Sequence, residues 1–269
     1  MTDIPAARFR ALHAPGEILV LPNAWDAASA RLTQEAGSKA IATSSASLAW
    51  AHGYSDGEAL PTSVLLSAVA EILRVVSVPV SVDSEAGYSA DPAAVAEHAA
   101  RLIKSGVAGI NLEDGRSPPD ITLRKIEAIR NRAAKMGGDL FINARTDVYL
   151  LKLTEPDHAL KETIARGRRY AAAGADGFFV PFLKETDAMK EIAAAVDLPL
   201  NILAVSGVPT VATLKAAGVR RLSTGAGPGR AAYGAAMRAA RMLLDEGRYD
   251  AMLESAADCP NFNALFAEN

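Results

Sequence analysis

Cysteine is almost absent from this sequence: Cys259 is the only one in 269 residues. A single thiol excludes an internal disulfide framework and is typical of a reducing compartment. No run approaches the roughly 18 apolar residues of a membrane span, and the N-terminus lacks the basic segment and apolar stretch of a secretory signal. We therefore expect a soluble, cytoplasmic protein.

Neither charge nor histidine is distributed in a way that suits two common classes of function. The chain carries 28 Lys and Arg against 31 Asp and Glu, and its basic residues form no stripe that could follow a phosphate backbone. Nucleic acid is therefore not an expected partner, and neither is a membrane. Histidine spacing gives no support to a zinc site. The four histidines are His13, His52, His98 and His158.

The chain is slightly longer than the roughly 250 residues of one (β/α)8 barrel, so a single domain over residues 1–269 is expected. Short apolar or β-branched runs alternate along it with longer amphipathic stretches, which is the pattern of βα units and a parallel sheet. The eight predicted strands are Ile18–Pro22, Ala40–Ser44, Pro79–Glu85, Gly109–Asp114, Phe141–Thr146, Gly177–Phe182, Leu198–Ala204 and Arg220–Gly225.

Helices are predicted between these strands, with glycine and proline placed as expected at helix ends. Asp91-Pro92 and Glu155-Pro156 each place proline just inside a helix, after an acidic residue that can cap it. Five helices are followed by a glycine: Gly37, Gly106, Gly137, Gly174 and Gly218. The predicted helices span 26–36, 61–76, 92–105, 122–136, 155–173, 185–196 and 209–217, with another pair within 230–257.

Eight strands with intervening helices predict a closed (β/α)8 TIM barrel with extra C-terminal helices. An open, doubly wound sheet is the alternative. The first strand, however, runs into Pro22-Asn23-Ala24-Trp25-Asp26 and not into the glycine fingerprint of the dinucleotide-binding folds. Barrel enzymes carry their catalytic groups at the C-terminal ends of the strands, so function is sought at those positions.

Carboxylates crowd the ends of the third and fourth predicted strands, in Asp83-Ser84-Glu85 and Glu113-Asp114. Four neighbouring acids would repel one another unless a cation lay among them. Oxygen ligands without histidine or thiol favour Mg²⁺ or Mn²⁺. The alternative is an ordinary acidic rim whose carboxylates cap helix N-termini.

Arg145 ends the fifth predicted strand, within Asn143-Ala144-Arg145-Thr146-Asp147. Its planar guanidinium suits a carboxylate, so a metal and Arg145 together predict a clamp for a carboxylate-bearing substrate. The alternative is an internal salt bridge from Arg145 to Asp147 or Glu113. Two weaker signals are the small polar residues 43–47, whose amides could hold an anion, and the 225–230 loop, where barrels often bind phosphate.

The ends of strands two to five together resemble the isocitrate lyase and phosphoenolpyruvate mutase superfamily, over most of the chain. Asp83-Ser84-Glu85-Ala86-Gly87-Tyr88 is similar to the family's Asp-x-Asp/Glu-x-Gly-Tyr/Phe metal motif. Residues 111–114 resemble its Leu-Glu-Asp segment and residues 143–147 its Ala-Arg-Thr-Asp segment. The resemblance implies Mg²⁺ held by Asp83, with Glu85 and Glu113 acting mainly through coordinated water. It also places Arg145 on the substrate carboxylate.

The same resemblance assigns further positions. It places Ser44, Ser45 and Ala46 in the substrate cradle, Asp56 at a further catalytic acid near the metal, and Asn201 at the family's strand-seven asparagine. It also implies a homo-oligomer, by family analogy a tetramer, whose subunits exchange the helices at 230–257.

Departures from the family pattern narrow the reaction. The Lys-Lys/Arg-Cys-Gly-His loop of the lyases is missing, because residues 114–120 lead almost directly into the next helix. The longer gating loop of the mutases and hydrolases is missing too, and Val180-Pro181-Phe182 lacks the glutamate of methylisocitrate lyases. What remains is a site that can bind a 2-oxo carboxylate and stabilise its enolate.

A reaction that needs only this part of the site is decarboxylation of a 3-carboxy-2-oxo acid such as oxaloacetate. The predicted function is a Mg²⁺-dependent carbon–carbon lyase acting on a small 2-oxo dicarboxylate. Water is an adequate proton donor, with His52 and Tyr54 as further candidates. Three alternatives stay open: isocitrate or 2-methylisocitrate cleavage in a relaxed site, phosphoenolpyruvate mutase-like activity, and 2-oxo acid binding without turnover.

Overall fold

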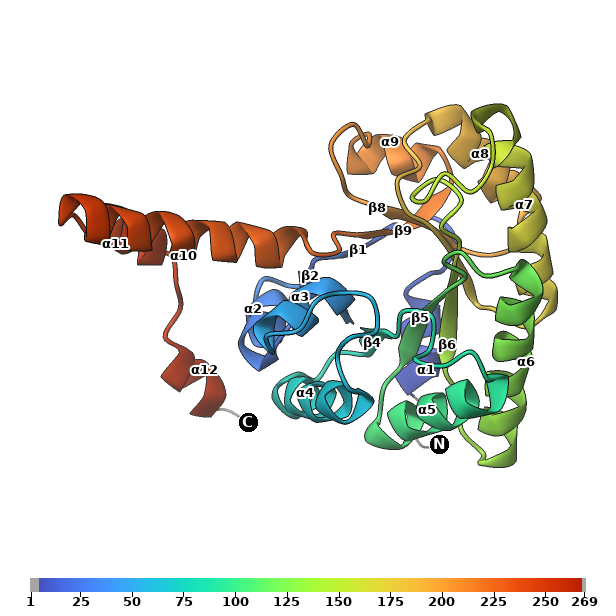
Figure 1. Cartoon of the computed structure of the whole chain (residues 1–269), viewed down its shortest axis with the longest axis horizontal. Coiled ribbons are helices and arrows are strands. Elements are labelled where there is room, and N and C mark those ends of the chain that lie inside the picture. The colour runs from blue at the N-terminus through green and yellow to red at the C-terminus, as the bar shows by residue number, and fades with distance from the viewer. Residues whose placement is uncertain (1–4, 268–269) are drawn as a thin grey trace.

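Parallel strands curl into one barrel, and helices surround it on the outside (Figure 1). The computed structural model describes residues 5–267. The strand order is β1-β9-β8-β7-β6-β5-β4-β3-β2, and the predicted (β/α)8 barrel with extra C-terminal helices is confirmed. The strands are β1 (Leu19–Leu21), β2 (Asn23–Ala24), β3 (Ile41–Thr43), β4 (Val80–Asp83), β5 (Gly109–Glu113), β6 (Phe141–Arg145), β7 (Gly177–Val180), β8 (Leu200–Leu203) and β9 (Val219–Ser223).

The barrel closes at Pro22, which divides the first predicted strand into β1 and β2. β1 pairs with β9 and β2 pairs with β3, so successive segments of the chain form the two edges of the sheet. Proline has no N–H to donate to a strand ladder. The Asn23 side chain bridges the join instead. Its Oδ1 accepts from the amides of Thr224 and Gly225 at 2.8 and 2.9 Å, and its Nδ2 donates to the Thr43 carbonyl.

Most helices end where the sequence predicts. All five terminal glycines have positive φ, from 66° at Gly137 to 103° at Gly174. Asp91 accepts from the Ala93 amide and caps its helix, but Glu155 makes no capping bond, so that predicted cap is wrong. Glutamate has a longer side chain than the residues that favour this position. The helices are α1 (Pro5–Ala11), α2 (Ala27–Glu35), α3 (Ser45–Ala51), α4 (Thr62–Val75), α5 (Pro92–Ser105), α6 (Pro119–Lys135), α7 (Pro156–Ala172), α8 (Thr186–Ala195), α9 (Val211–Ala216), α10 (Gly227–Glu246), α11 (Asp250–Ala256) and α12 (Phe262–Ala267).

The short helices α1, α3 and α12 carry no clear signal in the sequence, because six or seven residues are too few to display a helical period. Of these, α1 closes the N-terminal end of the barrel. The ring of Phe9 is fully buried and lies 5.1 Å from the ring of Phe141 inside the barrel. Together they anchor a small apolar cluster that is separate from the larger core between strands and helices.

Polar strand residues fill the barrel interior between this small apolar cluster, around Phe9 and Phe141, and the mouth at the C-terminal ends of the strands. Barrel interiors are usually filled by branched apolar residues. Here Arg221 is 1% exposed, and none of its three guanidinium nitrogens has a hydrogen-bond partner among residues 5–267. Burial lowers the pKa of Arg221 to about 10. Further polar residues that are buried on the strands are Ser81, Asn111, Asn143 and Asn201.

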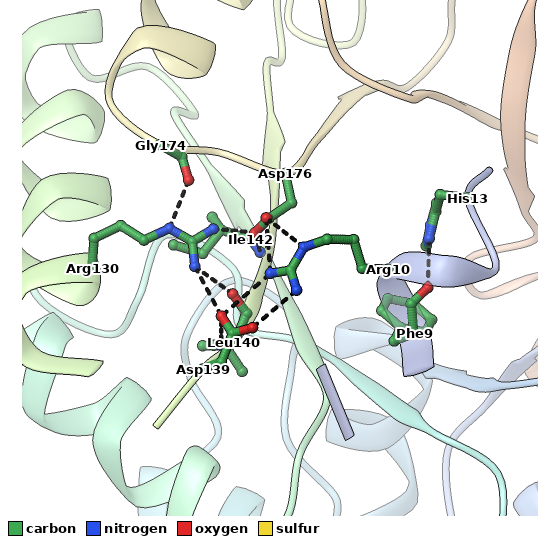
Figure 2. A network of polar contacts seen from close by, with 9 residues as sticks. All are labelled: Phe9, Arg10, His13, Arg130, Asp139, Leu140, Ile142, Gly174 and Asp176. Carbon is green, nitrogen blue, oxygen red and sulfur yellow. Dashed lines mark hydrogen bonds and ion pairs between the residues drawn. The ribbon is translucent and has the colours of Figure 1, made fainter. Parts of the chain in front are cut away.

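A polar network ties α1 and α6 to the strands at one point (Figure 2). Asp176, just before β7, accepts from Arg10 Nη2 at 3.0 Å, from the Ile142 amide at 2.8 Å, and from Arg130. Arg10 also donates to Asp139 at 2.9 Å. One carboxylate therefore serves two helices and a strand.

Asp176→Ala is expected to lower the free energy of unfolding by about 3–4 kcal/mol, because two guanidinium groups and an amide would lose their shared acceptor. Urea unfolding followed by circular dichroism measures the change. Asp197→Ala is the matched control, because Asp197 is exposed and also precedes a strand. Equal stability of the two variants would contradict a stabilising role for the network.

The C-terminal helices leave the barrel as an arm (Figure 1). α10 extends outward, and α11 packs against it. Apolar side chains are exposed along the arm, and Leu244 retains 83% of its surface. Other exposed apolar residues of the arm are Met237, Leu243, Met252 and Leu253. Within residues 5–267 no helix has both the length and the apolar character to cross a membrane.

Candidate active site

A pocket of about 340 Å³ opens at the C-terminal ends of the strands. This volume falls within the usual range for sites that bind small molecules. Predicted site residues that line it are Ser44, Ser45, Ala46, Asp56, Asp83 and Arg145. Glu85, Glu113 and Asn201 do not line the pocket.

Asp83 ends β4 and offers an unused acceptor. Its Oδ2 accepts from the Ser45 amide at 3.3 Å, and its own amide donates to Thr43 Oγ1 at 2.9 Å. Its Oδ1 is buried and has no hydrogen-bond partner among the described residues. A buried carboxylate oxygen without a partner is costly unless something else binds it.

Glu85 lies two residues after Asp83, and hydrogen bonds from two neighbouring residues hold its side chain. Its Oε2 accepts from the Glu58 amide at 2.6 Å, and its Oε1 accepts from the Tyr88 hydroxyl at 3.0 Å. The φ angles of Glu58, Glu85 and Tyr88 are 61°, 48° and 60°, a left-handed conformation that costs non-glycine residues about 1–3 kcal/mol each. Burial raises the pKa of Glu85 to about 7. Because both oxygens are engaged, Glu85 is better placed to act through water than to bind a cation directly.

Arg145 ends β6 and is 15% exposed at its side chain. Its Nη1 lies 2.6 Å from Glu113 Oε2, and its Nε and Nη2 donate to Asp147 at 2.7 and 3.2 Å. The internal salt bridges that the sequence left as an alternative are therefore present. They occupy three of the five N–H groups of the guanidinium, so two remain for an acceptor in the pocket.

Glu113, at the end of β5, is partly buried beside these groups, with 17% of its side chain exposed. Burial raises the pKa of Glu113 to about 8, although Arg145 acts in the opposite direction. Asp83 and Asp147 add to the rise. The neighbouring carboxyl groups of Glu113, Asp83 and Asp147 therefore outnumber the one guanidinium beside them, that of Arg145.

Asp114 does not belong to the acidic group, although it follows Glu113 directly. Its carboxylate is buried and accepts from Thr146 Oγ1, the Asp147 amide, Arg166 and the Tyr170 hydroxyl. Asp114 therefore joins α7 to the ends of β5 and β6. The crowding of four acids predicted from the sequence reduces to three.

The acidic group, formed by Asp83, Glu85 and Glu113, fits a hydrated divalent cation bound directly to Asp83. Among residues 5–267, no three His, Cys, Asp or Glu side chains lie close enough to form a metal cage by themselves. Mg²⁺ commonly takes one or two protein carboxylates and completes its shell with water and substrate. The free Oδ1 of Asp83 is the acceptor that such a cation requires. Burial is the main reason that the pKa values of Glu85 and Glu113 are raised, and neighbouring carboxylates add to the rise, so a cation beside them would favour their charged forms.

The predicted substrate cradle lies at the start of α3. Ser44 caps this helix by accepting from the Ser47 amide, and the Ser45 amide is already directed at Asp83. Asp56 lies in the exposed loop after α3 and reaches the same pocket. His52 and Tyr54 do not line it.

Asn201 is fully buried within the barrel. Its Oδ1 accepts from Ser223 Oγ at 3.2 Å, and its Nδ2 has no partner among the described residues. Asn201 therefore meets the pocket only through Ser223, which is a lining residue. Direct contact with substrate at Asn201 stays a prediction.

The pocket also contains lining residues that the sequence does not predict as site residues, among them Asn23, Asn111, Ser223 and Thr224. Asn23 and Asn111 lie in strand-end motifs, so their positions at the mouth could have been read from the strand pattern. Arg230 lies on α10, at the end of the 225–230 loop that the sequence indicates as a weak anion-binding signal, and the structure places it in the lining of this pocket.

Comparison with known proteins places the chain in a family. A family model described as phosphoenolpyruvate phosphomutase matches residues 9–244. An uncharacterised protein of Mycobacterium tuberculosis (strain H37Rv) is 39% identical over 242 residues, which cover 88% of this chain and 89% of that protein. The oxaloacetate decarboxylase of Pseudomonas savastanoi pv. phaseolicola is 28% identical over 254 residues, which cover 89% and 83%.

A solved structure points the same way. A protein of Burkholderia cenocepacia J2315, provisionally named a phosphonomutase, is 42% identical and superposes with a TM-score of 0.82. The match covers 90% of this chain and 99% of that one. The chain therefore belongs to the phosphoenolpyruvate mutase family, within the isocitrate lyase and phosphoenolpyruvate mutase superfamily.

Proposed function

We propose that this protein is a carbon–carbon lyase that depends on Mg²⁺ or Mn²⁺ and acts on a small 2-oxo dicarboxylate, with oxaloacetate decarboxylation as the leading reaction. One observation carries the proposal: Asp83, whose buried Oδ1 has no hydrogen-bond partner among residues 5–267, and Arg145 line one small pocket. A cation and a guanidinium in one pocket suit the carboxylate and the neighbouring carbonyl of a 2-oxo acid.

Each of the acidic residues would have a separate task. Asp83 would hold the cation directly, and Glu85 and Glu113 would hold its water molecules. The cation would supply positive charge next to the C2 oxygen, where negative charge develops as carbon dioxide leaves. Asp56 would complete the acidic side of the pocket.

Arg145 would bind the C1 carboxylate and orient the bond that breaks. Glu113 and Asp147 keep its guanidinium in one place, so little further ordering would be needed on binding. Ser44, Ser45 and Ala46 would contact the same end of the substrate. Solvent water would return a proton to C3.

The short connection after β5 supports decarboxylation over the other reactions of the family. Only residues 114–118 separate β5 from α6. This connection contains no cysteine, histidine or lysine that could serve as a general acid or base. Loss of carbon dioxide needs no such group, because no proton is removed in the step that breaks the bond. The similarity to an oxaloacetate decarboxylase is consistent with this reading.

The function is tested by product release from a panel of acids, with and without Mg²⁺. The panel is oxaloacetate, isocitrate, 2-methylisocitrate and phosphoenolpyruvate. We expect pyruvate from oxaloacetate at a rate well above the spontaneous one, and loss of that activity with a chelator. Cleavage of another member of the panel alone would overturn the decarboxylase assignment. Binding of these acids without product would indicate a 2-oxo acid-binding protein.

We also propose a homo-oligomer, by family analogy a tetramer, in which the arm formed by α10 and α11 packs on a neighbouring subunit. The apolar side chains exposed along this arm support the proposal, because apolar surface of this kind is usually covered by a partner. Light scattering at micromolar concentration should give a multiple of the 28.1 kDa chain mass. Leu244→Glu should lower that mass. A monomeric wild-type protein would count against the assembly.

A further inference from the structure

A second arginine lines the pocket, and its side chain has no partner among residues 5–267. Arg230, in the first turn of α10, is exposed, and its guanidinium makes no hydrogen bond or ion pair with any residue in the described range 5–267, although its backbone amide donates to the Ala226 carbonyl. Arg145, by comparison, is paired with Glu113 and Asp147. The pocket therefore contains one arginine that is fixed by acids and one that is available.

The two arginines belong to different sides of the barrel mouth. Arg145 ends β6, and Arg230 follows β9, which lies three strands away around the ring. The acids that line the pocket, Asp56 and Asp83, belong to the side formed by β3 and β4. The lining residues supplied by the ends of β8 and β9 include no acid. A second anionic group would thus meet Arg230 without repulsion from a neighbouring carboxylate.

The position of Arg230 is set by close packing around it. Asn23 holds the preceding loop through the amides of Thr224 and Gly225. A Cβ on Gly229 would lie 2.5 Å from Ser47 Oγ, so the start of α10 lies directly against α3. The backbone is therefore fixed at the mouth of the pocket, while the Arg230 side chain is left without a partner in the described structure.

We propose that Arg230 binds the distal carboxylate of the substrate and selects dicarboxylic over monocarboxylic 2-oxo acids. This inference rests on the proposed function, in which the cation and Arg145 bind the C1 end. An arginine forms charge-assisted hydrogen bonds to a carboxylate and stays charged at any working pH. A monocarboxylic acid such as pyruvate has nothing to place beside Arg230.

The contact has a kinetic signature if the distal carboxylate is the one that leaves. The bond between C3 and this carboxylate breaks, its electron pair forms the C2–C3 double bond of an enolate whose charge lies on the C2 oxygen, and the carboxylate departs as neutral carbon dioxide. Arg230 would then stabilise the bound substrate more than the transition state. Removing Arg230 should raise KM without lowering kcat, whereas damage to the barrel would lower kcat as well.

The experiment compares Arg230→Met with Arg238→Met, an exposed arginine two turns further along α10. With Mg²⁺ present, Arg230→Met should raise the KM for oxaloacetate about tenfold, the loss expected of a partly solvated charge-assisted contact. Its inhibition constant for pyruvate should not change. Arg238→Met should resemble the wild type for both acids, and Arg230→Lys should recover part of the loss.

Failure of this inference can be told apart from failure of the proposed function. If oxaloacetate is not turned over, titration calorimetry with oxaloacetate and pyruvate replaces KM with dissociation constants, and the same tenfold difference is expected. An equal change for both acids, or no change for either, would overturn the role of Arg230. Absence of turnover with a selective loss of oxaloacetate binding would overturn only the lyase.

Discussion

Asp83→Ala is expected to lower kcat/KM toward oxaloacetate about a thousandfold at saturating Mg²⁺, because a metal ion contributes several kcal/mol of charge stabilisation in the transition state. Among residues 5–267, Asp83 is the only member of the group Asp83, Glu85 and Glu113 that lines the pocket, and its buried Oδ1 has no hydrogen-bond partner there. Its side chain makes one hydrogen bond, to the Ser45 amide at 3.3 Å. The barrel should therefore remain folded in this variant.

Metal affinity is the direct readout of this prediction. Mn²⁺ binding followed by electron paramagnetic resonance should weaken strongly in Asp83→Ala. Asp83→Asn is informative as well, because it keeps the side-chain volume and an acceptor for Ser45 but removes the charge. Asp187→Asn, at an exposed position on α8, serves as the control. Undiminished Mn²⁺ affinity in Asp83→Ala would remove Asp83 from the metal site.

Arg145→Lys is expected to weaken kcat/KM by about 1.5–3 kcal/mol, the range for a charge-assisted hydrogen bond, or roughly 10- to 150-fold. Lysine keeps the positive charge beside Glu113 but lacks the planar fork that reaches Asp147 and a substrate carboxylate together. The loss should appear with every 2-oxo acid that the enzyme accepts, since all of them share the C1 carboxylate.

The salt bridges of Arg145 make a stability measurement necessary beside the kinetics. Breaking a buried ion pair can itself be destabilising, so thermal unfolding should be compared in the presence and absence of oxalate. If Arg145 binds carboxylate, oxalate should stabilise the wild type more than Arg145→Lys. Wild-type kinetics toward every accepted acid would instead assign Arg145 to a purely structural salt bridge.

Much of the barrel could be predicted because its signals are local. A glycine at a left-handed helix end, as at Gly106 or Gly174, reflects the steric freedom of one residue. Alternation of apolar runs with amphipathic stretches reflects the burial of strands under helices. The division of the first strand at Pro22 depends instead on two edges meeting across the barrel, and residues far apart in the sequence provide that contact.

The candidate site also has one part that local sequence signals predict and another that only spatial neighbours decide. Asp83 and Arg145 could be located from the sequence, because parallel strands in a barrel deliver their C-terminal ends to one mouth. Whether each acid faces that mouth is decided by its neighbours in space: Asp114 turns toward Arg166 and Tyr170, which are supplied by α7. The sequence by itself therefore determined the architecture and the strand ends that carry the chemistry. Only the tertiary structure decided that Asp114 is structural, that Arg145 is already paired, and that the Arg230 side chain lies in the pocket without a partner among the described residues, because these depend on packing between segments far apart in the sequence.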